Sequence, residues 1–218
     1  MPWSLSLISA PSQVAVYHSA TLARELETAV VALVREILEA TLGITPTWLI
    51  RPGVSECQSQ WPLVKAVYSD LTGLDLPDVM RSVERRTVDA VLHTAGNPPR
   101  ILEVDEKQHF NAYRARTLRH YLGSVPIAFD GDLWLRRSEV KQKLEGGGFA
   151  APRPPLFPGD GGRHRQRAYR DALADLLPIE HGWSPTLRIA DFEVRAWIHT
   201  SDARAQMEDL LRSRLRGG

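Results

Sequence analysis

Residues 101–110, with the sequence ILEVDEKQHF, bring several groups capable of acid–base or metal chemistry to the end of a short apolar run. Successive side chains of a strand point to opposite faces, so residues two apart share a face. Leu102 and Val104 are therefore expected to point into a core, and Glu103 and Asp105 to point together to the other side. Two carboxylates at a strand end are suited to binding a cation or moving a proton.

A second apolar run, residues 86–92, lies upstream and carries a single carboxylate, Asp89. If the two runs pair as a hairpin, Asp89, Glu103 and Asp105 converge at one edge of a sheet. Clustered carboxylates raise one another's pKa values, and a hard divalent cation such as Mg²⁺ removes that penalty. The pattern predicts a Mg²⁺ site, in which Mn²⁺ can substitute, that activates a phosphodiester for hydrolysis. The simpler alternative is a polar strand end with solvated acids.

Asp89, the apolar residues after it and Glu103-Val104-Asp105 resemble the active-site hairpin of the PD-(D/E)xK nuclease superfamily, which carries an Asp and then Glu-x-Lys. The resemblance implies that Asp89, Glu103 and Asp105 hold the metal ion. Asp105 occupies the usual lysine position, which leaves Lys107 or His109 to activate water or stabilise charge.

A second register would use Asp105-Glu106-Lys107 as the Asp-x-Lys triplet. It is less favoured because Glu106 would continue the core-facing row of Leu102 and Val104. A buried, unpaired carboxylate there would cost several kcal/mol, so the strand is expected to end near Asp105.

Within the superfamily, residues 84–130 are most similar to the branch of very-short-patch-repair endonucleases. In that branch the second strand is followed by Gln-His or His and then by an arginine-bearing helix, here Gln108, His109, Arg114 and Arg116. The superfamily's first helix often donates a glutamate. The sequence does not choose among four candidates in the predicted helix 21–42, namely Glu25, Glu27, Glu36 and Glu39.

Other polar residues are secondary members of the predicted site. Glu56 and Arg51 lie in a polar loop after the strand-like run 48–50, where they either serve the site or are simply solvated. Gln108 is expected to position a water, a phosphate or the backbone. His109 is either a general acid or base or a residue that holds its own loop.

Basic residues are concentrated in the second half of the chain. Between positions 136 and 170 there are nine Lys or Arg residues against three acidic ones. Such a patch is typical of phosphate-backbone binding, although a solvated helix face gives the same pattern. The predicted nucleic-acid contacts are Arg85, Arg86, Arg114, Arg116, Arg137 and Lys141.

The order of elements predicts the fold class. Helices are predicted at 21–42, 61–71, 112–122, 137–144, 165–177 and 202–215, and strands at 86–92, 100–105, 125–129 and 186–194. In the last strand, Asp191 and Glu193 are interpreted as parts of a structural edge. This order predicts an α/β fold: a restriction-endonuclease-like core with a central mixed sheet flanked by helices. The predicted units are the core (1–146), a Gly/Pro-rich linker (147–162) and a C-terminal α/β extension (163–218) packed on the core.

Composition excludes several classes of protein. The 218 residues are 43% hydrophobic and carry a net charge of +1. No window has the roughly 20 apolar residues of a membrane span, and the N-terminus does not resemble a signal peptide. A single cysteine, Cys57, rules out an internal disulfide and fits a reducing cytoplasm.

These features predict a cytoplasmic, Mg²⁺-dependent endonuclease acting on DNA, with RNA not excluded and a homodimer plausible. The first alternative, motivated by the missing lysine, is a catalytically inactive nucleic-acid-binding module of the same fold. The second is a protein-interaction protein whose acids are ordinary surface.

Overall fold

A computed structural model describes residues 13–79, 86–140, 144 and 150–215, with side chains from residue 22 onward. The described strands form one four-stranded sheet in the order β1-β2-β3-β4. β1 pairs antiparallel with β2, β2 pairs antiparallel with β3, and β3 pairs parallel with β4. The sheet is therefore mixed, and its strands are β1 (Thr41–Leu42), β2 (Ala90–His93), β3 (Arg100–Asp105) and β4 (Ser184–Ala190).

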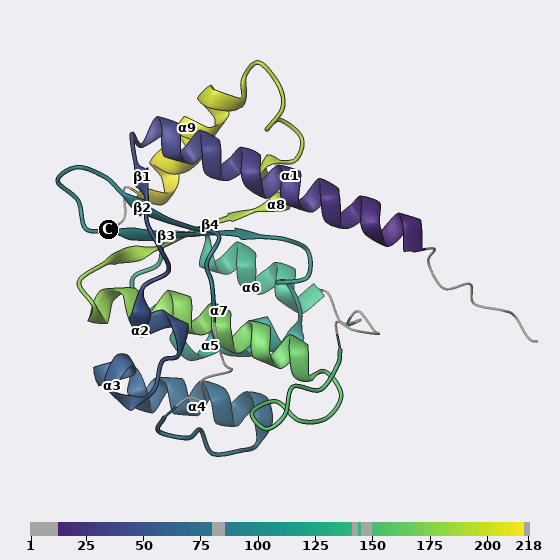
Figure 1. The fold of residues 1–218 in the computed structure, drawn as a ribbon, viewed down its shortest axis with the longest axis vertical. Helices are drawn as coiled ribbons and strands as arrows, with labels where there is room; N and C mark the ends of the chain where they lie inside the picture. Colours follow the sequence, from purple (N-terminus) through teal and green to yellow (C-terminus); the bar gives the residue numbers. More distant parts are fainter. Residues whose placement is uncertain (1–12, 80–85, 141–143, 145–149, 216–218) are drawn as a thin grey trace, which may run out of the picture.

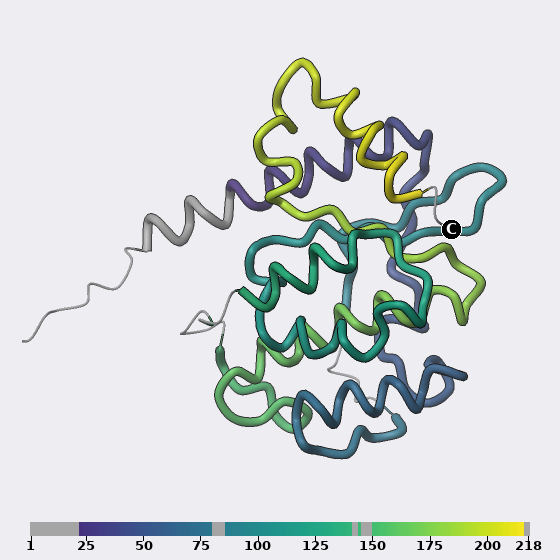
Figure 2. The backbone as a smooth tube through the Cα atoms, turned by 180° about the vertical axis from the view of Figure 1, so that it is seen from behind, coloured from purple at the N-terminus to yellow at the C-terminus, as the bar shows by residue number. Residues whose placement is uncertain are grey.

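Helices cover both faces of this sheet (Figure 1). One face is covered by α1 (Gln13–Ile37) and α9 (Ala203–Leu215). The other is covered by α5 (Ala112–Tyr121), α6 (Gly131–Val140) and α7 (Gly162–Glu180), and α4 (Trp61–Thr72) packs outside α5 and α7. The view from behind shows the same layers (Figure 2). Shorter elements are α2 (Thr47–Ile50), α3 (Val54–Cys57), the 3₁₀ turn η1 (Gln58–Gln60) and α8 (Asp191–Val194).

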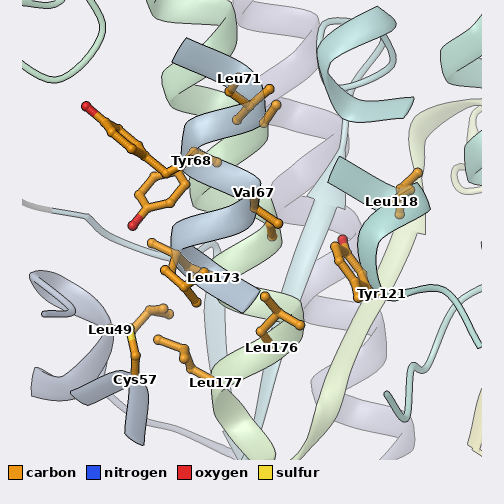
Figure 3. Packing of buried hydrophobic residues seen from close by; sticks show 14 of the residues in the cluster. Leu49, Cys57, Val67, Tyr68, Leu71, Leu118, Tyr121, Leu173, Leu176 and Leu177 are labelled. Atoms are coloured by element: carbon orange, nitrogen blue, oxygen red, sulfur yellow. The ribbon is translucent and has the colours of Figure 1, made fainter. Parts of the chain in front are cut away.

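The alternation predicted for β3 is confirmed. Leu102 and Val104 are buried in the hydrophobic cluster formed with α1 and α9. Ile101 belongs to the cluster on the other face, formed mainly by α4, α5 and α7. Figure 3 shows part of this second cluster, to which α4 contributes Val67 and Leu71 and α7 contributes Leu173 and Leu176. Glu103 and Asp105 share the face of Ile101, so both project toward the α5–α7 layer.

Local signals in the sequence explain the best-predicted boundaries. α4 ends at Gly73, whose φ of 71° is easily adopted by glycine. α5 begins after Asn111, whose side chain accepts hydrogen bonds from the backbone N–H groups of Tyr113 and Arg114. β3 has the predicted bounds, residues 100–105.

Several segments predicted to be extended are not strands. Residues 125–129 contribute only one isolated bridge, between Ala128 and Leu187, and Pro126 has no N–H for a ladder. The run 48–50 lies in the helical turn α2. Residues 191–194 form the turn α8, because Glu193 accepts a hydrogen bond from the Ala190 N–H and caps a helix instead of continuing β4.

Helix boundaries also differ from the prediction, and two of the differences have a local cause. α1 ends at Ile37, and the chain turns at Glu39, which has a φ of 49°. α6 begins at Gly131, six residues earlier than predicted. The Asp130 side chain accepts a hydrogen bond from the Leu133 N–H and so caps the helix at that earlier point.

The chain after residue 163 completes the central sheet. β4 pairs with β3 over most of its length, and α7 packs directly under both strands. Before α7, Leu156 and Phe157 are buried in the core, and the Tyr68 hydroxyl donates a hydrogen bond to the Leu156 carbonyl. The protein is thus α/β, with a mixed sheet flanked by helices, as predicted. None of its described helices has the length and apolar character of a membrane span.

Candidate active site

A cleft of about 360 Å³ lies where the end of β3, the segment before β2 and the first half of α7 meet. Its size is within the range of ligand-binding sites. Acidic and neutral polar side chains come from the strand side, and basic ones come mainly from α7. The charged and amide residues that line it are Arg86, Asp89, Glu103, Glu106, Gln108, His109, Arg163, Gln166, Arg167, Arg170 and Asp171.

Asp89 and Glu103 both line this cleft, as the sequence predicts. Ala90 pairs with Leu102, and the same antiparallel register continued by one residue places Asp89 opposite Glu103. Asp89 Oδ2 accepts a hydrogen bond of 2.7 Å from the Val104 N–H. The surrounding protein removes water and raises the pKa of Asp89 to about 6. The backbone hydrogen bond opposes this shift, and the negative charge of Glu27 adds to it.

Glu103 is only 5% exposed. Its Oε1 lies 2.6 Å from Arg86 Nη2, and Arg86 is held in place by a further hydrogen bond to the Arg170 carbonyl. Burial raises the pKa of Glu103 to about 7. The positive charge of Arg86 opposes this shift, and the negative charge of Asp89 adds to it. Asp89 and Glu103 are therefore two carboxylates that resist being ionised together.

Asp105 has a different environment from its neighbour two residues earlier. It is 0% exposed and does not line the cleft. Oδ2 accepts a hydrogen bond of 2.7 Å from Trp134 Nε1, and Oδ1 accepts one of 2.7 Å from Arg188 Nη1. The structure does not bring Asp105 to Asp89 and Glu103 as a third metal ligand, because both of its oxygens are already bound inside the protein.

Arg188 of β4 is the centre of this buried network. Besides Asp105, its Nε binds Asp175 Oδ1 at 2.7 Å and its Nη2 donates to the Asp171 carbonyl at 3.0 Å. Arg114 Nη2 lies 2.7 Å from the other oxygen of Asp175. Arg114 is 1% exposed, so its predicted contact with nucleic acid is corrected: its guanidinium holds the helices together and does not reach the surface.

His109 connects the network to the cleft. Its Nδ1 lies 3.0 Å from Asp171 Oδ2 and 3.5 Å from Asp105 Oδ1, while its side chain keeps 18% exposure at the cleft. Burial disfavours the charged ring, but the negative charge of Asp171 outweighs it and raises the pKa of His109. His109 reciprocally holds the pKa of Asp171 far below its usual value, against the effect of burial. Nδ1 is fixed by Asp171, which leaves Nε2 as the ring nitrogen for chemistry in the cleft.

The structure distinguishes one of the four glutamates of the first helix. Burial raises the pKa of Glu27, followed by the negative charges of Glu106 and, more weakly, Glu103. Glu27 in turn raises the pKa of Asp89. Glu27 of α1 therefore lies near the acidic side of the cleft.

Within the described ranges, no three Asp, Glu, His or Cys side chains form a group already arranged to hold a metal ion. Mg²⁺ does not require such a group, because it is often bound by one or two carboxylates, several waters and a substrate phosphate. Asp89 and Glu103 supply the two carboxylates of such a site. Their raised pKa values indicate unfavourable negative charge, which a cation between them would relieve.

Of the remaining predicted residues, Gln108 is at the cleft and the others lie elsewhere. Glu56 accepts a hydrogen bond from the Gly53 N–H and caps α3, and Arg51 lines a small neighbouring pocket that also contacts Arg86 and Arg170. Gln108 is at the cleft and donates to Glu106 Oε2 at 2.6 Å. Three others do not line the cleft: Lys107, which is exposed; Arg116, which binds Asp70 of α4; and Arg137, which lies over the Phe192 ring. Arg85 and Lys141 lie outside the described residues.

Several site residues were not identified individually in the sequence. Asp171 and Asp175 lie four apart on α7, so they share a helix face. Arg188 stands between Leu187 and Ile189 in a buried strand, which is a signal of a buried ion pair. Arg163 and Arg167 were counted only as part of a basic patch. Their spacing of four residues also places them on one side of the helix.

No family model matches this chain, and neither a curated protein nor a solved structure matches it. The resemblance to the PD-(D/E)xK superfamily therefore depends on the sequence motif alone.

Proposed function

We propose that this protein is a divalent-metal-dependent nuclease that hydrolyses phosphodiester bonds in DNA, on a restriction-endonuclease-like core. One observation carries the proposal. Two adjacent carboxylates with raised pKa values, Asp89 and Glu103, face arginines of α7 across a single cleft. A cation at the carboxylates and a phosphate between them and the arginines would satisfy both sets of charges.

Asp89 and Glu103 would hold the metal ion, with Mg²⁺ the expected ion and Mn²⁺ a substitute. When bound, it would polarise a phosphoryl oxygen and lower the pKa of a water. Glu27 and Glu106 lie near these carboxylates, where their charge favours a cation in this part of the cleft. Asp105 contributes indirectly, because it fixes the end of β3 through Trp134 and Arg188.

His109 supplies the proton in this proposal. Asp171 raises the pKa of His109, so the ring keeps its proton to a higher pH than a free histidine does, and Asp171 also fixes its Nδ1. The cleft-facing nitrogen would then donate a proton to the leaving oxygen as a general acid, a role worth about 10²–10⁴-fold in rate. With this assignment, His109 takes a catalytic role in a site where Asp105 stands in place of the usual lysine.

The test is cleavage of supercoiled plasmid DNA with Mg²⁺, Mn²⁺ or EDTA. We expect nicking with either metal and none in EDTA. The rate should fall by at least about 10²-fold in Asp89→Asn and Glu103→Gln, while the exposed-surface control Glu139→Gln keeps wild-type rates. A labelled RNA of the same sequence tests the choice of nucleic acid. Metal-independent cutting, or full activity in Glu103→Gln, would contradict the proposal.

A second candidate function is supported by the ion pairs of the site. Glu103 is paired with Arg86, and Asp105 is held by Arg188 and Trp134. These contacts suit a module of the same fold that binds nucleic acid without cutting it. Tight, salt-dependent binding of DNA with no product in Mg²⁺ or Mn²⁺ would favour this alternative.

A further inference from the structure

The first half of α7 carries arginines on the side that faces the cleft. Arg163, Arg167 and Arg170 are spaced at i, i+4 and i+7, which places them along one face of the helix. All three line the cleft. Arg167 lies close enough to His109 for its positive charge to oppose protonation of that ring. The row of arginines therefore extends from the N-terminus of α7 to His109, the proposed general acid.

Arg163 and Arg167 line the cleft, and no carboxylate in the described part of the chain pairs with either of them. The Nη1 atom of Arg167 is buried and has no hydrogen-bond partner there. Arg163 has cations as neighbours: burial lowers its pKa, and the positive charges of Arg167 and Arg153 lower it further. Buried donors without acceptors and clustered like charges are both unfavourable in the free protein.

The position of these arginines at the start of α7 is not favoured by the helix itself. No acidic residue is present in the first turn of α7, and cations at a helix N-terminus are disfavoured by the helix dipole. The first N–H groups are already used, since Gly162 donates to the Gly159 carbonyl and Arg163 to the Ala151 carbonyl. Any anion bound here would therefore be held by the arginine side chains.

Arg165 shows the contrast on the same helix. Its guanidinium donates to the carbonyls of Pro158 and Asp160 and lies over the Tyr113 ring. It does not line the cleft. The sequence gives these arginines the same appearance, but the structure separates one that anchors a loop from two that face the cleft unpaired.

We infer that Arg163 and Arg167 form a binding subsite for a phosphate group of a polynucleotide, on the α7 side of the cleft and opposite Asp89 and Glu103. A tetrahedral phosphate accepts hydrogen bonds from two guanidinium groups at once, and paired donors of this kind are the strong form of phosphate recognition. The inference rests on the proposed function for the kind of phosphate, which is one in a nucleic-acid backbone. The subsite would position the strand so that an adjacent phosphodiester reaches the carboxylates.

The experiment measures binding of a fluorescent DNA duplex by anisotropy in EDTA, where the proposed hydrolysis does not occur. Each phosphate contact is worth about 8-fold in affinity at about 0.1 M salt, so Arg163→Gln/Arg167→Gln should weaken binding by about 60-fold and lower the salt slope by about 1.8. Arg165→Gln is the matched control and should bind like the wild type. Unchanged binding by the double variant, or an equal loss in Arg165→Gln, would overturn the inference.

Competition and melting distinguish a polynucleotide subsite from a small-anion site and from a purely structural role. Inorganic phosphate and a mononucleotide should not displace DNA at concentrations near its Kd; displacement there would identify a small anion as the ligand and overturn the polynucleotide assignment. The double variant should melt at or above the wild-type temperature, because it removes repulsion among cations. Melting well below it would show that these arginines support the fold instead.

The two proposals fail in different ways. Arginine-dependent binding without metal-dependent cutting contradicts the proposed nuclease activity and leaves the subsite. Cutting that continues with arginine-independent binding contradicts the subsite alone. No binding of DNA by the wild type contradicts both.

Discussion

Replacing Arg188 with methionine tests whether the buried network supports the site. Arg188 makes three charge-assisted hydrogen bonds of 2.7, 2.7 and 3.0 Å, to Asp105, Asp175 and the Asp171 carbonyl. Methionine keeps similar bulk but makes none of them. Asp175 would retain Arg114 and Tyr121, whereas Asp105 would retain the hydrogen bond from Trp134 and the longer contact of 3.5 Å with His109. The penalty therefore falls mainly on Asp105, a fully buried carboxylate.

Removing one partner of a buried ion pair costs about 3–5 kcal/mol, because the remaining charge is left uncompensated. We expect Arg188→Met to lower the free energy of unfolding by that amount, measured by urea denaturation at pH 7. For a chain of this size the melting temperature should fall by about 6–20 °C. Adding Asp105→Asn should recover roughly 1–3 kcal/mol, because the uncompensated charge is then absent.

The control is Arg204→Met, since Arg204 is 53% exposed and pairs with Glu36 and Glu208 on the surface. Exposed pairs contribute about 0–1 kcal/mol, so this variant should melt close to the wild type. If Arg188→Met loses no more than Arg204→Met, or if Asp105→Asn makes it worse, then Arg188 is not neutralising Asp105 and the assigned role is wrong.

Two further predictions concern pH. His109 has a raised pKa in the folded protein. The stability that it contributes is therefore present below its unfolded pKa, near 6.5, and is lost as pH rises through the folded pKa. Urea unfolding should show that His109→Gln costs more stability at about pH 6 than at about pH 9, and an equal cost at both would contradict the pairing with Asp171. Glu103 has a pKa of about 7 instead of 4.5. Its ionisation should therefore remove roughly 3 kcal/mol of folding stability between about pH 4.5 and 8. This loss should disappear in Glu103→Gln, and an unchanged pH profile of stability would show that another group causes it.

Much of the fold follows from short-range signals in the sequence. The period-two pattern of residues 100–105 predicted β3 and its two faces, because burial on both sides leaves few alternatives. Gly73 and Asn111 set the ends of α4 and α5 through local backbone geometry. These features depend on a few adjacent residues, so the sequence alone could predict them.

The strand predictions that were wrong concern segments whose structure depends on contacts between distant parts of the chain. The apolar run 125–129 looks like a strand, but its edge position leaves only one bridge to β4. Residues 86–89 were predicted to extend β2. Instead Arg86 binds Glu103 and Arg170, so the segment forms part of the cleft. Propensity could not reveal either outcome, because each is decided by where α7 and β4 pack.

The same dependence separates the two carboxylates of β3. Glu103 and Asp105 share a strand face and are chemically similar, so the sequence predicted one role for both. Trp134 and Arg188 enclose Asp105, whereas Glu103 remains at the cleft with Asp89. An Asp105 variant would therefore lose a buried ion pair and, through the contact with His109, disturb the proton-bearing residue as well. Loss of cleavage in such a variant does not identify a metal ligand. Only an Asp89 or Glu103 variant that remains folded and still binds DNA can do so, because those two side chains meet the cleft directly.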